Sequence, residues 1–424
     1  MNHHIHFIGI GGIGVSALAQ YYRSQGWAVS GSDASQSEVT DGLEARGITI
    51  FIGHDAAQVG DAEKVIYSAA VRNDNSEFIA AEEKHIPILS YAEAIGELTR
   101  TFYTIGVSGS HGKSTTTALI GLVLTHAGFD PTIIVGTKLK DLEGTNFRLG
   151  NSKYLVLEAD EWNRSFLNYT PSVVVLTNID NDHLDTYGSL EGVIEGFRTY
   201  LSKIPERAVV IANGGNEHTR MLAEELEKAG RHRVIFFNTK EFERHQLTVP
   251  GFHNQLNAEA AWQVANMLGI SRIVTEEAFQ AYQGAWRRLE EISHGIYSDY
   301  AHHPTEVIAT LSALREQFPQ KKIVAVFQPH HQDRFNRLFD EFVHAFDVAD
   351  VTIILPIYVV KGREFQEGKT PRDLVQEMNK PQVVTADSFE TLGKMLEPEI
   401  KIDAIIVCMS AGDLDAWVRK TYLK

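Results

Sequence analysis

Short runs of aliphatic and β-branched residues recur along the chain, and helical segments separate most of them. Such runs lie at residues 5–10, 27–33, 48–53, 64–69, 86–91, 103–107, 153–160, 172–180, 296–300, 321–327, 351–358 and 404–409. Strands that are apolar on both faces and alternate with helices are typical of parallel sheets covered by helices. The pattern therefore predicts an α/β fold.

The runs fall into three blocks, residues 1–98, 99–284 and 285–424, and no long linker separates them. The chain has 424 residues, of which 43% are hydrophobic. At about 100–200 residues per domain, this length allows two to four domains. No repeat and no low-complexity segment interrupts the pattern. We expect three domains.

The charge balance narrows the classes of partner. Lys and Arg number 39 and Asp and Glu number 55, which gives a net charge of −16. A surface this acidic is unsuited to general binding of nucleic acid or anionic membranes, so we expect no nucleic-acid partner. A local basic pocket for a phosphorylated small molecule remains compatible with it. The N-terminus has no signal-peptide pattern and no long apolar stretch, so we expect no membrane insertion.

Cys408 is the only cysteine. Its isolation excludes an intrachain disulfide and a cysteine-based zinc site, and it favours a reducing, cytoplasmic location. His3, His4 and His6 could form a metal-binding tract or a tag remnant, but the apolar run that follows favours the start of a first strand.

A first glycine-rich turn follows the run at residues 5–10 and opens a helix at residues 15–25. Its glycines are Gly9, Gly11, Gly12 and Gly14. Glycines let the backbone approach a pyrophosphate at a helix N-terminus, and Asp33, at the end of the next strand, suits a ribose hydroxyl. The turn indicates a dinucleotide or nucleotide-sugar site. A glycine turn that only packs a helix on a sheet is the competing interpretation.

A second glycine-rich turn lies between the strand at residues 103–107 and a helix at residues 116–128. It reads Gly109, Ser110, His111, Gly112, Lys113, Ser114 and Thr115. Backbone amides of such a loop cradle ATP phosphates, the lysine reaches the β- and γ-oxygens, and the Ser114 hydroxyl can ligate Mg²⁺. The full phosphate-loop pattern requires a glycine where this chain has Val107, so the match is partial.

Acidic residues and a histidine follow the next two strands. They are Glu158, Asp160 and Glu161 after one strand, and Asp180, Asp182, His183 and Asp185 after the other. Carboxylate and imidazole groups at the carboxyl ends of parallel strands can hold hard cations beside phosphates. Together with the phosphate loop, they predict a metal site rather than solvated strand ends.

Seven motifs, in this order, resemble those of the Mur ligase family. They span residues 6–19, 109–120, 158–167, 177–188, 250–261, 298–306 and 326–342, nearly the whole chain. The resemblance implies ATP-dependent amide bond formation on a UDP-linked peptidoglycan precursor. It also implies three domains: an N-terminal Rossmann-like UDP-substrate-binding domain, a central P-loop ATPase α/β domain and a C-terminal Rossmann-like domain that closes over both ligands.

The resemblance assigns roles residue by residue. It places the UDP substrate on Gly9, Gly11, Gly12, Gly14, Asp33, His54 and Ser68. It places ATP on Gly109, Ser110, His111, Gly112, Lys113, Ser114, Thr115, Asn254, Asn257, Arg288 and Asp299. Two Mg²⁺ ions would involve Ser114, Glu158 and His183, and the acceptor would lie near Tyr300, His302, His331 and Arg334. The catalytic candidates are Lys113, His183 and Arg334.

One motif departs from the family pattern. Two arginines usually lie around the substrate carboxylates, whereas this chain keeps Arg334 and has His331 at the position of the first. A neutral imidazole cannot replace a bidentate guanidinium. Either His331 is protonated in the site or a neighbour such as Arg337 takes over this function.

The resemblance implies UDP-N-acetylmuramate, ATP and L-alanine as substrates of a monomer or homodimer. A recycling ligase that adds a tripeptide to UDP-N-acetylmuramate is the close alternative. A nicotinamide-dependent oxidoreductase would account for the first glycine turn alone, and a nucleotide-binding regulator would lack the ligase chemistry. Neither of these two explains the second glycine turn together with the acidic cluster.

Overall fold

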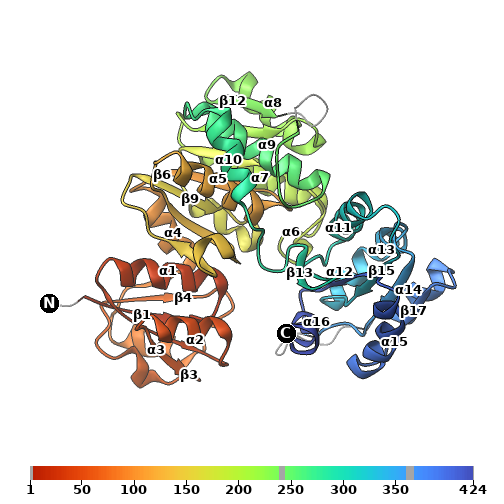
Figure 1. The fold of residues 1–424 in the computed structure, drawn as a ribbon. Helices are drawn as coiled ribbons and strands as arrows, with labels where there is room; N and C mark the ends of the chain where they lie inside the picture. Colours follow the sequence, from red (N-terminus) through yellow and green to blue (C-terminus); the bar gives the residue numbers. More distant parts are fainter. Residues whose placement is uncertain (1–2, 238–243, 360–366, 424) are drawn as a thin grey trace. The chain divides into compact units, whose positions relative to one another are not determined.

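In the computed structural model, which describes residues 3–237, 244–359 and 367–423, the strands form three separate sheets (Figure 1). Most neighbouring strands are parallel and are connected through helices, as the alternating pattern predicts. The observed architecture is α/β.

The first sheet is wholly parallel, with strand order β3-β2-β1-β4-β5. Its strands are β1 (His4–Ile8), β2 (Ala28–Asp33), β3 (Thr49–Ile52), β4 (Lys64–Tyr67) and β5 (Ile88–Ser90). Its helices are α1 (Ile13–Ser24), α2 (Glu38–Ala45), the 3-10 turn η1 (Ala56–Val59), α3 (Ser76–Glu83) and α4 (Tyr91–Thr99). The chain turns to opposite sides of β1, so the carboxyl end of β1 is the switch point where α/β sheets bind ligands.

The second sheet has strand order β12-β11-β10-β6-β9-β7-β8, and only β7 and β8 pair antiparallel. Its strands are β6 (Tyr103–Ser108), β7 (Thr132–Leu139), β8 (Thr145–Arg148), β9 (Tyr154–Glu158), β10 (Val173–Leu176), β11 (Val209–Asn213) and β12 (Arg233–Phe237). Its helical segments are α5 (Lys113–His126), η2 (Lys140–Leu142), η3 (Trp162–Asn168), α6 (Leu184–Tyr187), α7 (Leu190–Lys203), α8 (Glu217–Ala229), α9 (Phe252–Met267) and α10 (Arg272–Ala281). Because β6 lies between β9 and β10, the loops that follow these three strands share one edge.

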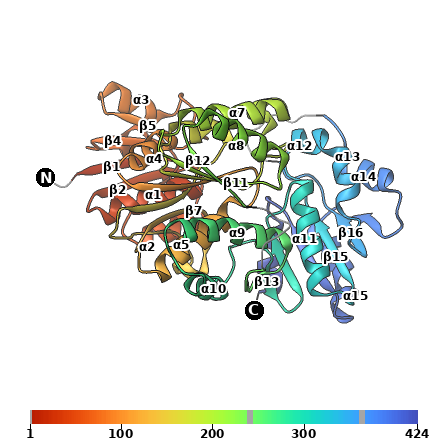
Figure 2. The ribbon, with the colours of Figure 1, turned by 90° about the horizontal axis from the view of Figure 1, so that it is seen from above.

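The third sheet has strand order β13-β14-β18-β15-β16-β17, with β13 and β14 antiparallel. Its strands are β13 (Glu290–Ser293), β14 (Ile296–Asp299), β15 (Ile323–Phe327), β16 (Val351–Ile354), β17 (Val383–Thr385) and β18 (Ile405–Met409). Its helices, in cyan to blue in Figure 2, are α11 (Pro304–Gln317), α12 (Gln332–Arg337), α13 (Phe339–Ala345), α14 (Pro371–Met378), α15 (Phe389–Lys401) and α16 (Leu414–Tyr422).

Two apolar clusters cover this third sheet. Residues of α11, α13 and α14 pack in one cluster, and residues of α15 and α16 pack in the other. Cys408 of β18 is 2% exposed, and burial raises the pKa of its thiol to about 12. The thiol is therefore part of the core.

The chain divides into two compact units by its internal contacts. One comprises residues 1–246 and 256–283 and holds the first two sheets, and the other comprises residues 247–255 and 284–424. The predicted domain boundaries near residues 98 and 284 stay a prediction. Among the residues that the structure describes, no helix combines the length and the apolar character needed to cross a membrane.

Candidate functional site

The first glycine turn forms where β1 ends. Gly9 has a φ of 78°, and a Cβ there would lie 2.8 Å from the Cβ of Ser68. The Gly11 amide donates to Asp33 Oδ2 at 2.9 Å. A side chain at either glycine would be strained or would collide with a neighbour. The structure thus brings Asp33 and Ser68 to the turn, as the sequence predicts for one binding site.

Tyr91, at the start of α4, closes this turn on the far side of Gly14. A Cβ at Gly14 would lie 2.8 Å from the Tyr91 hydroxyl oxygen. Burial raises the pKa of Tyr91, and the charges of Glu158 and Asp160 raise it further. Tyr91 therefore stays protonated between the glycine turn and the acidic residues of the second sheet. No motif in the sequence marks this tyrosine.

His54 lies just after β3 and contacts a carboxylate that the sequence analysis missed. Its Nδ1 is 2.9 Å from Oε1 of Glu77, which is completely buried in the first turn of α3. A glutamate in the first turn of a short helix gives no sequence signal of burial. Glu77 is found only through the fold.

The phosphate loop connects β6 to α5. Gly109 has a φ of 136° and Gly112 a φ of 81°. A Cβ at Gly109 would collide with Thr177 and Asn178, and one at Gly112 would collide with Asn257. Val107 belongs to β6 itself and is fully buried, so the missing glycine of the longer pattern is a strand residue here.

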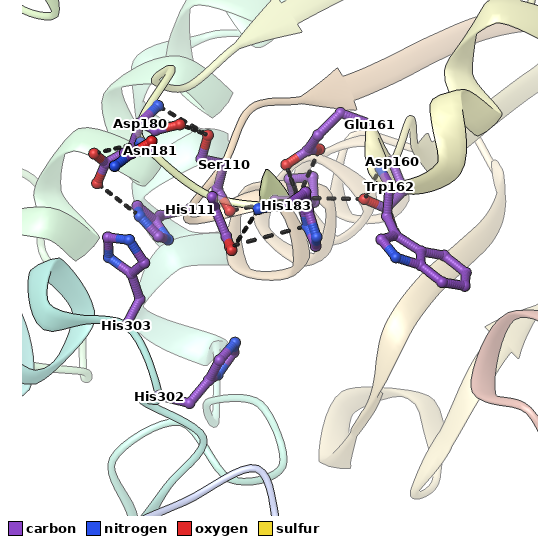
Figure 3. Close-up of polar contacts among 12 residues, drawn as sticks. Ser110, His111, Asp160, Glu161, Trp162, Asp180, Asn181, His183, His302 and His303 are labelled. Atoms are coloured by element: carbon purple, nitrogen blue, oxygen red, sulfur yellow. Dashed lines mark hydrogen bonds and ion pairs between the residues drawn. The ribbon is translucent and has the colours of Figure 1, made fainter. Parts of the chain in front are cut away.

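Polar contacts fix the phosphate loop to the segment after β10. The His111 amide donates to Asn178 Oδ1 at 2.9 Å, and the Asp180 amide donates to Ser110 Oγ at 2.9 Å. The His111 ring nitrogen Nε2 lies 2.9 Å from Asp180 Oδ2. Figure 3 shows the contacts of Ser110 and His111 with Asp180. Two motifs that are about 70 residues apart along the chain form a single structural unit.

Lys113 lies within the acidic cluster. Its Nζ donates to both carboxylate oxygens of Glu161, at 2.9 and 3.0 Å, and to the Gly109 carbonyl at 2.7 Å, and it lies 3.5 Å from Asp160. His183 Nε2 is 3.7 Å from Glu161 Oε1 (Figure 3). Asp160, Glu161 and His183 each offer a ligand atom within 4.8 Å of the others. The resemblance assigned the metal to Ser114, Glu158 and His183, and Asp160 and Glu161 belong to the acidic cluster that the sequence predicted beside them.

Glu158 and Ser114 meet on the other side of the lysine. The Gly136 amide donates to Glu158 Oε1 at 2.5 Å, and Ser114 also forms a hydrogen bond with this carboxylate. A Cβ at Gly136 would lie 2.7 Å from Glu158 Oε2, so the carboxylate fits only against glycine. The structure thus brings together Ser114 and Glu158, two of the predicted magnesium ligands.

The electrostatics of the cluster favour an added cation. Burial raises the pKa of Glu161 to about 8 and also raises the pKa of Glu158. Burial opposes the charge of Asp160 too, but Lys113 and His183 hold its pKa below the ordinary range. Burial disfavours the Lys113 cation, but Glu161 and Asp160 hold the lysine pKa above its ordinary range. Three carboxylates lie around this one lysine, and Glu161 among them is fully buried, a donor set that fits a divalent cation.

The other predicted ATP residues fall into both compact units. Asn257 Oδ1 accepts from Thr116 Oγ1 at 3.2 Å, beside Gly112 of the phosphate loop. Thr115 is buried in the first turn of α5. Three more predicted ATP residues, Asn254, Arg288 and Asp299, belong to the second unit.

Within that second unit, each of these three residues has a local partner. The Asn254 amide donates to the Pro250 carbonyl at 2.7 Å, and Arg288 Nη1 lies 3.4 Å from Glu306 Oε1. Asp299 accepts from the amides of Leu289 and Ala301, both at 2.7 Å. Both carboxylate oxygens of Asp299 therefore shape the turn around β14.

Two of the predicted acceptor residues lie beside α11. His302 Nδ1 is 2.8 Å from the Tyr300 carbonyl, and the Tyr300 ring lies below the Arg287 guanidinium, 4.8 Å away. His302 Nδ1 is also 3.3 Å from Glu306 Oε2. The Arg287 contact fixes the face of the Tyr300 ring.

The other two acceptor residues belong to α12. His331 caps this helix with a φ of 66°, which is unusual for a residue other than glycine and often marks a functional position. Arg334 lies one turn further on. Arg337, which the sequence offered as a substitute cation, has its Nε bound to both Asp333 oxygens at 2.9 and 3.0 Å. A local carboxylate already engages Arg337.

Known proteins match this chain over nearly all of its length. Residues 4–103 match the Mur ligase family catalytic domain, residues 107–260 the Mur ligase middle domain, and residues 287–412 the Mur ligase glutamate ligase domain. The UDP-N-acetylmuramate–L-alanine ligase of Persephonella marina is 36% identical over 97% of this chain and 94% of its own length. The ligase of the same name from Aquifex aeolicus is 37% identical, with coverage of 97% and 95%.

Solved structures agree with this match. UDP-N-acetylmuramate-alanine ligase MurC from Thermotoga maritima superposes with a TM-score of 0.82 at 28% identity, covering 98% of this chain and 97% of that one. A murein peptide ligase from Psychrobacter arcticus has the same fold, with a TM-score of 0.71 at 22% identity and coverage of 99% and 98%.

Fold and site together define a multidomain α/β protein with a phosphate loop beside a carboxylate–imidazole cluster. The chain belongs to the Mur ligase family. The predicted three-domain α/β fold is confirmed by this membership and by the Thermotoga maritima structure.

Proposed function

We propose that the protein is an ATP-dependent ligase that joins L-alanine to the muramoyl carboxylate of UDP-N-acetylmuramate. The observation that carries the proposal is the contact of Lys113 with the phosphate loop, with the buried Glu161 and with Asp160. The names of relatives that match over nearly the whole chain supply the substrates. The domains are assigned as residues 1–98 for the UDP substrate, 99–284 for ATP and 285–424 for closure over ATP and the acceptor.

The chemistry begins with a carboxylate that is a poor electrophile. Its attack on the γ-phosphorus of ATP gives an acyl phosphate and ADP, and it brings anions together. Lys113 would move its Nζ from Glu161 to a phosphate oxygen, while the amides of the loop from Gly109 to Gly112 cradle the phosphates. The amine of alanine then attacks the acyl carbon, and inorganic phosphate leaves.

The donors that would hold divalent cations, one or two Mg²⁺ ions, are Ser114, Glu158 and His183, with Asp160 and Glu161 beside them. A cation there supplies charge neutralisation at the phosphate oxygens. An imidazole nitrogen that ligates a metal has no free lone pair, so His183 is a ligand rather than a general base in this proposal.

The acceptor carboxylate is assigned to Arg334, with Tyr300, His302 and His331 near the muramoyl group and the amino acid. A guanidinium binds a carboxylate by two parallel hydrogen bonds. A cytoplasmic location belongs to the same proposal, because the ligands are those of peptidoglycan precursor synthesis and the single cysteine is a buried thiol.

Phosphate release measured with UDP-N-acetylmuramate, ATP, Mg²⁺ and each of the twenty amino acids in turn tests the proposal. Release should need every component and should be fastest with L-alanine. A tripeptide of L-alanine, D-glutamate and diaminopimelate serves as the competing acceptor. Faster release with the tripeptide would identify a recycling ligase, and release without any nucleotide sugar would exclude both ligases.

A further inference from the structure

A fully buried carboxylate lies under the first sheet, away from the phosphate loop. Glu77 Oε2 is 2.7 Å from His6 Nε2 and accepts from Ser32 Oγ at 2.7 Å, and Oε1 is 2.9 Å from His54 Nδ1. With its amide nitrogen turned inward, Gln58 also donates to Oε1 at 3.2 Å. Four donors from β1, β2, η1 and the segment after β3 converge on one side chain.

These donors keep Glu77 ionised. Burial opposes the charge, but the hydrogen bonds from His6, Ser32 and His54 outweigh it and hold the pKa of Glu77 below its ordinary range. An ionised carboxylate has lone pairs and no proton to give, so each partner must donate. If Nδ1 of His54 had no proton, it would face Oε1 of Glu77 at 2.9 Å with a lone pair on each atom. His54 therefore carries its proton on Nδ1.

When the imidazole of His54 is neutral, its other ring nitrogen is then an acceptor. A neutral imidazole with its proton on Nδ1 has a lone pair at Nε2. Within the described ranges of the chain, the His54 ring forms its hydrogen bonds, to Ser32 and Glu77, through Nδ1, and the side chain is 27% exposed. The fold thus presents one oriented lone pair to the outside of the first sheet.

This lone pair lies at the ligand edge of the sheet. His54 follows β3 by two residues, and Ile52 of β3 is in register with Asp33 of β2. The Gly53 amide donates to the Asp33 carbonyl at 2.8 Å, and Asp33 in turn accepts from Gly11 of the glycine turn. His54 is therefore two short contacts away from the turn that is proposed to hold the pyrophosphate.

We propose that Glu77 is a positioning residue that fixes His54 as a hydrogen-bond acceptor for the N3–H of the bound base, and that this selects uracil over cytosine. The inference rests on the proposed function, which supplies a uridine nucleotide as the ligand. Uracil and cytosine have nearly the same shape, but N3 carries a hydrogen in uracil and a lone pair in cytosine. An acceptor that the bound base covers is left unpaired when it meets a lone pair, and sites built on such a hydrogen bond reject the wrong partner strongly.

Exchanging Glu77 for glutamine should reverse this preference. A glutamine at position 77 keeps an oxygen for His6 and Ser32 and turns an N–H toward His54, while the Gln58 amide can rotate to face it with its oxygen. His54 Nδ1 must then accept, so the ring proton moves to Nε2. That nitrogen now donates, which suits N3 of cytosine.

The binding of UDP and of CDP to the full-length protein, measured by calorimetry, is the test. Wild type should bind UDP at least about tenfold more tightly than CDP. Glu77→Gln should weaken UDP and strengthen CDP, so that the ratio falls to about one or inverts. The matched control is Asp61→Asn: Asp61 is 94% exposed and reaches the same histidine–serine network only through His4, so this variant should keep the wild-type ratio.

A second readout separates orientation from a structural effect. Nitrogen NMR of protein labelled at histidine should show the His54 proton on Nδ1 in wild type and on Nε2 in Glu77→Gln. If Glu77→Gln does not fold, His54→Leu removes the acceptor directly and should bring UDP and CDP within about twofold of each other.

The results distinguish a failure of the positioning role of Glu77 from a failure of the proposed function. An unchanged UDP-to-CDP ratio in Glu77→Gln or in His54→Leu overturns the positioning role. A wild-type His54 that is protonated on Nε2 overturns it as well. A wild type that binds neither nucleotide but still binds ATP would instead contradict the proposed function of the first sheet.

Discussion

Lys113 must exchange its present partners for a phosphate oxygen if ATP binds at this loop. Its ammonium group is bound to Glu161 and to the Gly109 carbonyl, whereas phosphate-loop chemistry needs it on a phosphoryl oxygen. The exchange leaves Glu161 without its closest cation. A divalent cation next to His183 would compensate for that loss, which couples metal binding to the movement of one lysine.

Lys113→Ala should nearly abolish phosphate release while nucleotide-sugar binding stays close to wild type. In the proposed mechanism the lysine would stabilise a transferring phosphoryl group, a contribution of about 3 kcal/mol or more, and it belongs to a different loop from Gly9 and Gly11. Turnover and calorimetry with UDP-N-acetylmuramate measure the two effects. Lys228→Ala, an exposed lysine of α8, is the control. A large loss of nucleotide-sugar affinity in Lys113→Ala would show that the two glycine turns do not serve separate ligands.

Arg334→Ala should raise the KM for alanine far more than the KM for ATP. A charge-assisted hydrogen bond to a partly desolvated carboxylate is worth about 2–4 kcal/mol, or some 30-fold to several hundred-fold in KM. Steady-state kinetics with each substrate varied in turn gives both constants. Arg337→Ala, on the same helix but paired with Asp333, should leave the alanine KM unchanged. Equal effects of the two variants would place the acceptor carboxylate elsewhere.

At the residue scale, sequence motifs predicted those side chains whose position along the chain is set by the ligand they would bind. Lys113 and Ser114 lie on the phosphate loop, and Asp33 and Ser68 lie at the first glycine turn, as expected. The sequence analysis did not identify Tyr91 and Glu77, because their contacts form only with residues that are distant along the chain. A tyrosine or a glutamate in the first turn of a helix resembles an ordinary surface residue until the sheet beneath it is known.

At the scale of elements, the segment from β6 through the phosphate loop to α5 is the most constrained part of the site. Residues of α5 are buried from Thr115 to Leu124, so the helix lies in the core with no freely solvated face. Glycines with positive φ occur at both of its ends, Gly112 before it and Gly128 after it. The two differ in their surroundings, because Asn257 lies against Gly112 and nothing lies within 4 Å of a Cβ at Gly128.

Gly112→Ala should therefore impair ATP turnover strongly, whereas Gly128→Ala should only lower stability. Both substitutions carry the cost of a left-handed backbone, about 1 kcal/mol. Only Gly112→Ala also forces the loop away from Asn257. The KM for ATP and the thermal midpoint of each variant distinguish the two costs. If both variants lose ATP affinity equally, the close contact between Gly112 and Asn257 does not contribute to ATP binding.

The sequence predicts the end of a helix or strand where a single residue, such as a proline, prevents it from continuing. The run at residues 351–358 forms a strand only to Ile354, because Pro356 has no N–H to continue the ladder. Six strands, β7, β8, β11, β12, β13 and β17, lie outside the runs named from the sequence. Most of these lie at or near sheet edges, where one neighbour is missing and the apolar signal is weaker. Sheet order itself depends on long-range pairing that local pattern does not encode.

At the scale of the whole molecule, the chain passes between its two compact units more than once. Residues 247–255 belong with the C-terminal unit, although residues 256–283 return to the first unit. Local apolar pattern contains no signal for this exchange, because it depends on which surfaces the segment meets after folding. His253 lies in that exchanged segment and provides a probe of its folding.

His253→Gln should flatten the pH dependence of stability between about pH 6.5 and 4. Burial and, to a smaller extent, the charge of Arg288 together lower the pKa of His253 to about 4. In that interval the unfolded chain binds a proton that the folded chain does not, so the free energy of unfolding decreases as the pH falls. The stabilisation is complete above pH 6.5 and amounts to at most about 3 kcal/mol. Thermal unfolding from pH 7 to pH 4 measures it.

His294→Gln is the control for this pH profile, because His294 belongs to the same unit and is 91% exposed. Its profile should run parallel to that of wild type. A His253→Gln profile that also runs parallel to wild type would show that the segment at residues 247–255 does not keep this imidazole away from solvent.

The solitary thiol of Cys408 makes the protein suitable for site-specific labelling. Since the chain has one cysteine, and it is 2% exposed in the middle of β18, maleimide dyes should not react with the folded protein. A new cysteine placed on the surface of each compact unit could then carry a donor and an acceptor fluorophore without removal of the native one. The same thiol becomes reactive when the third sheet opens, so the rate of its modification reports that unfolding event with no added probe.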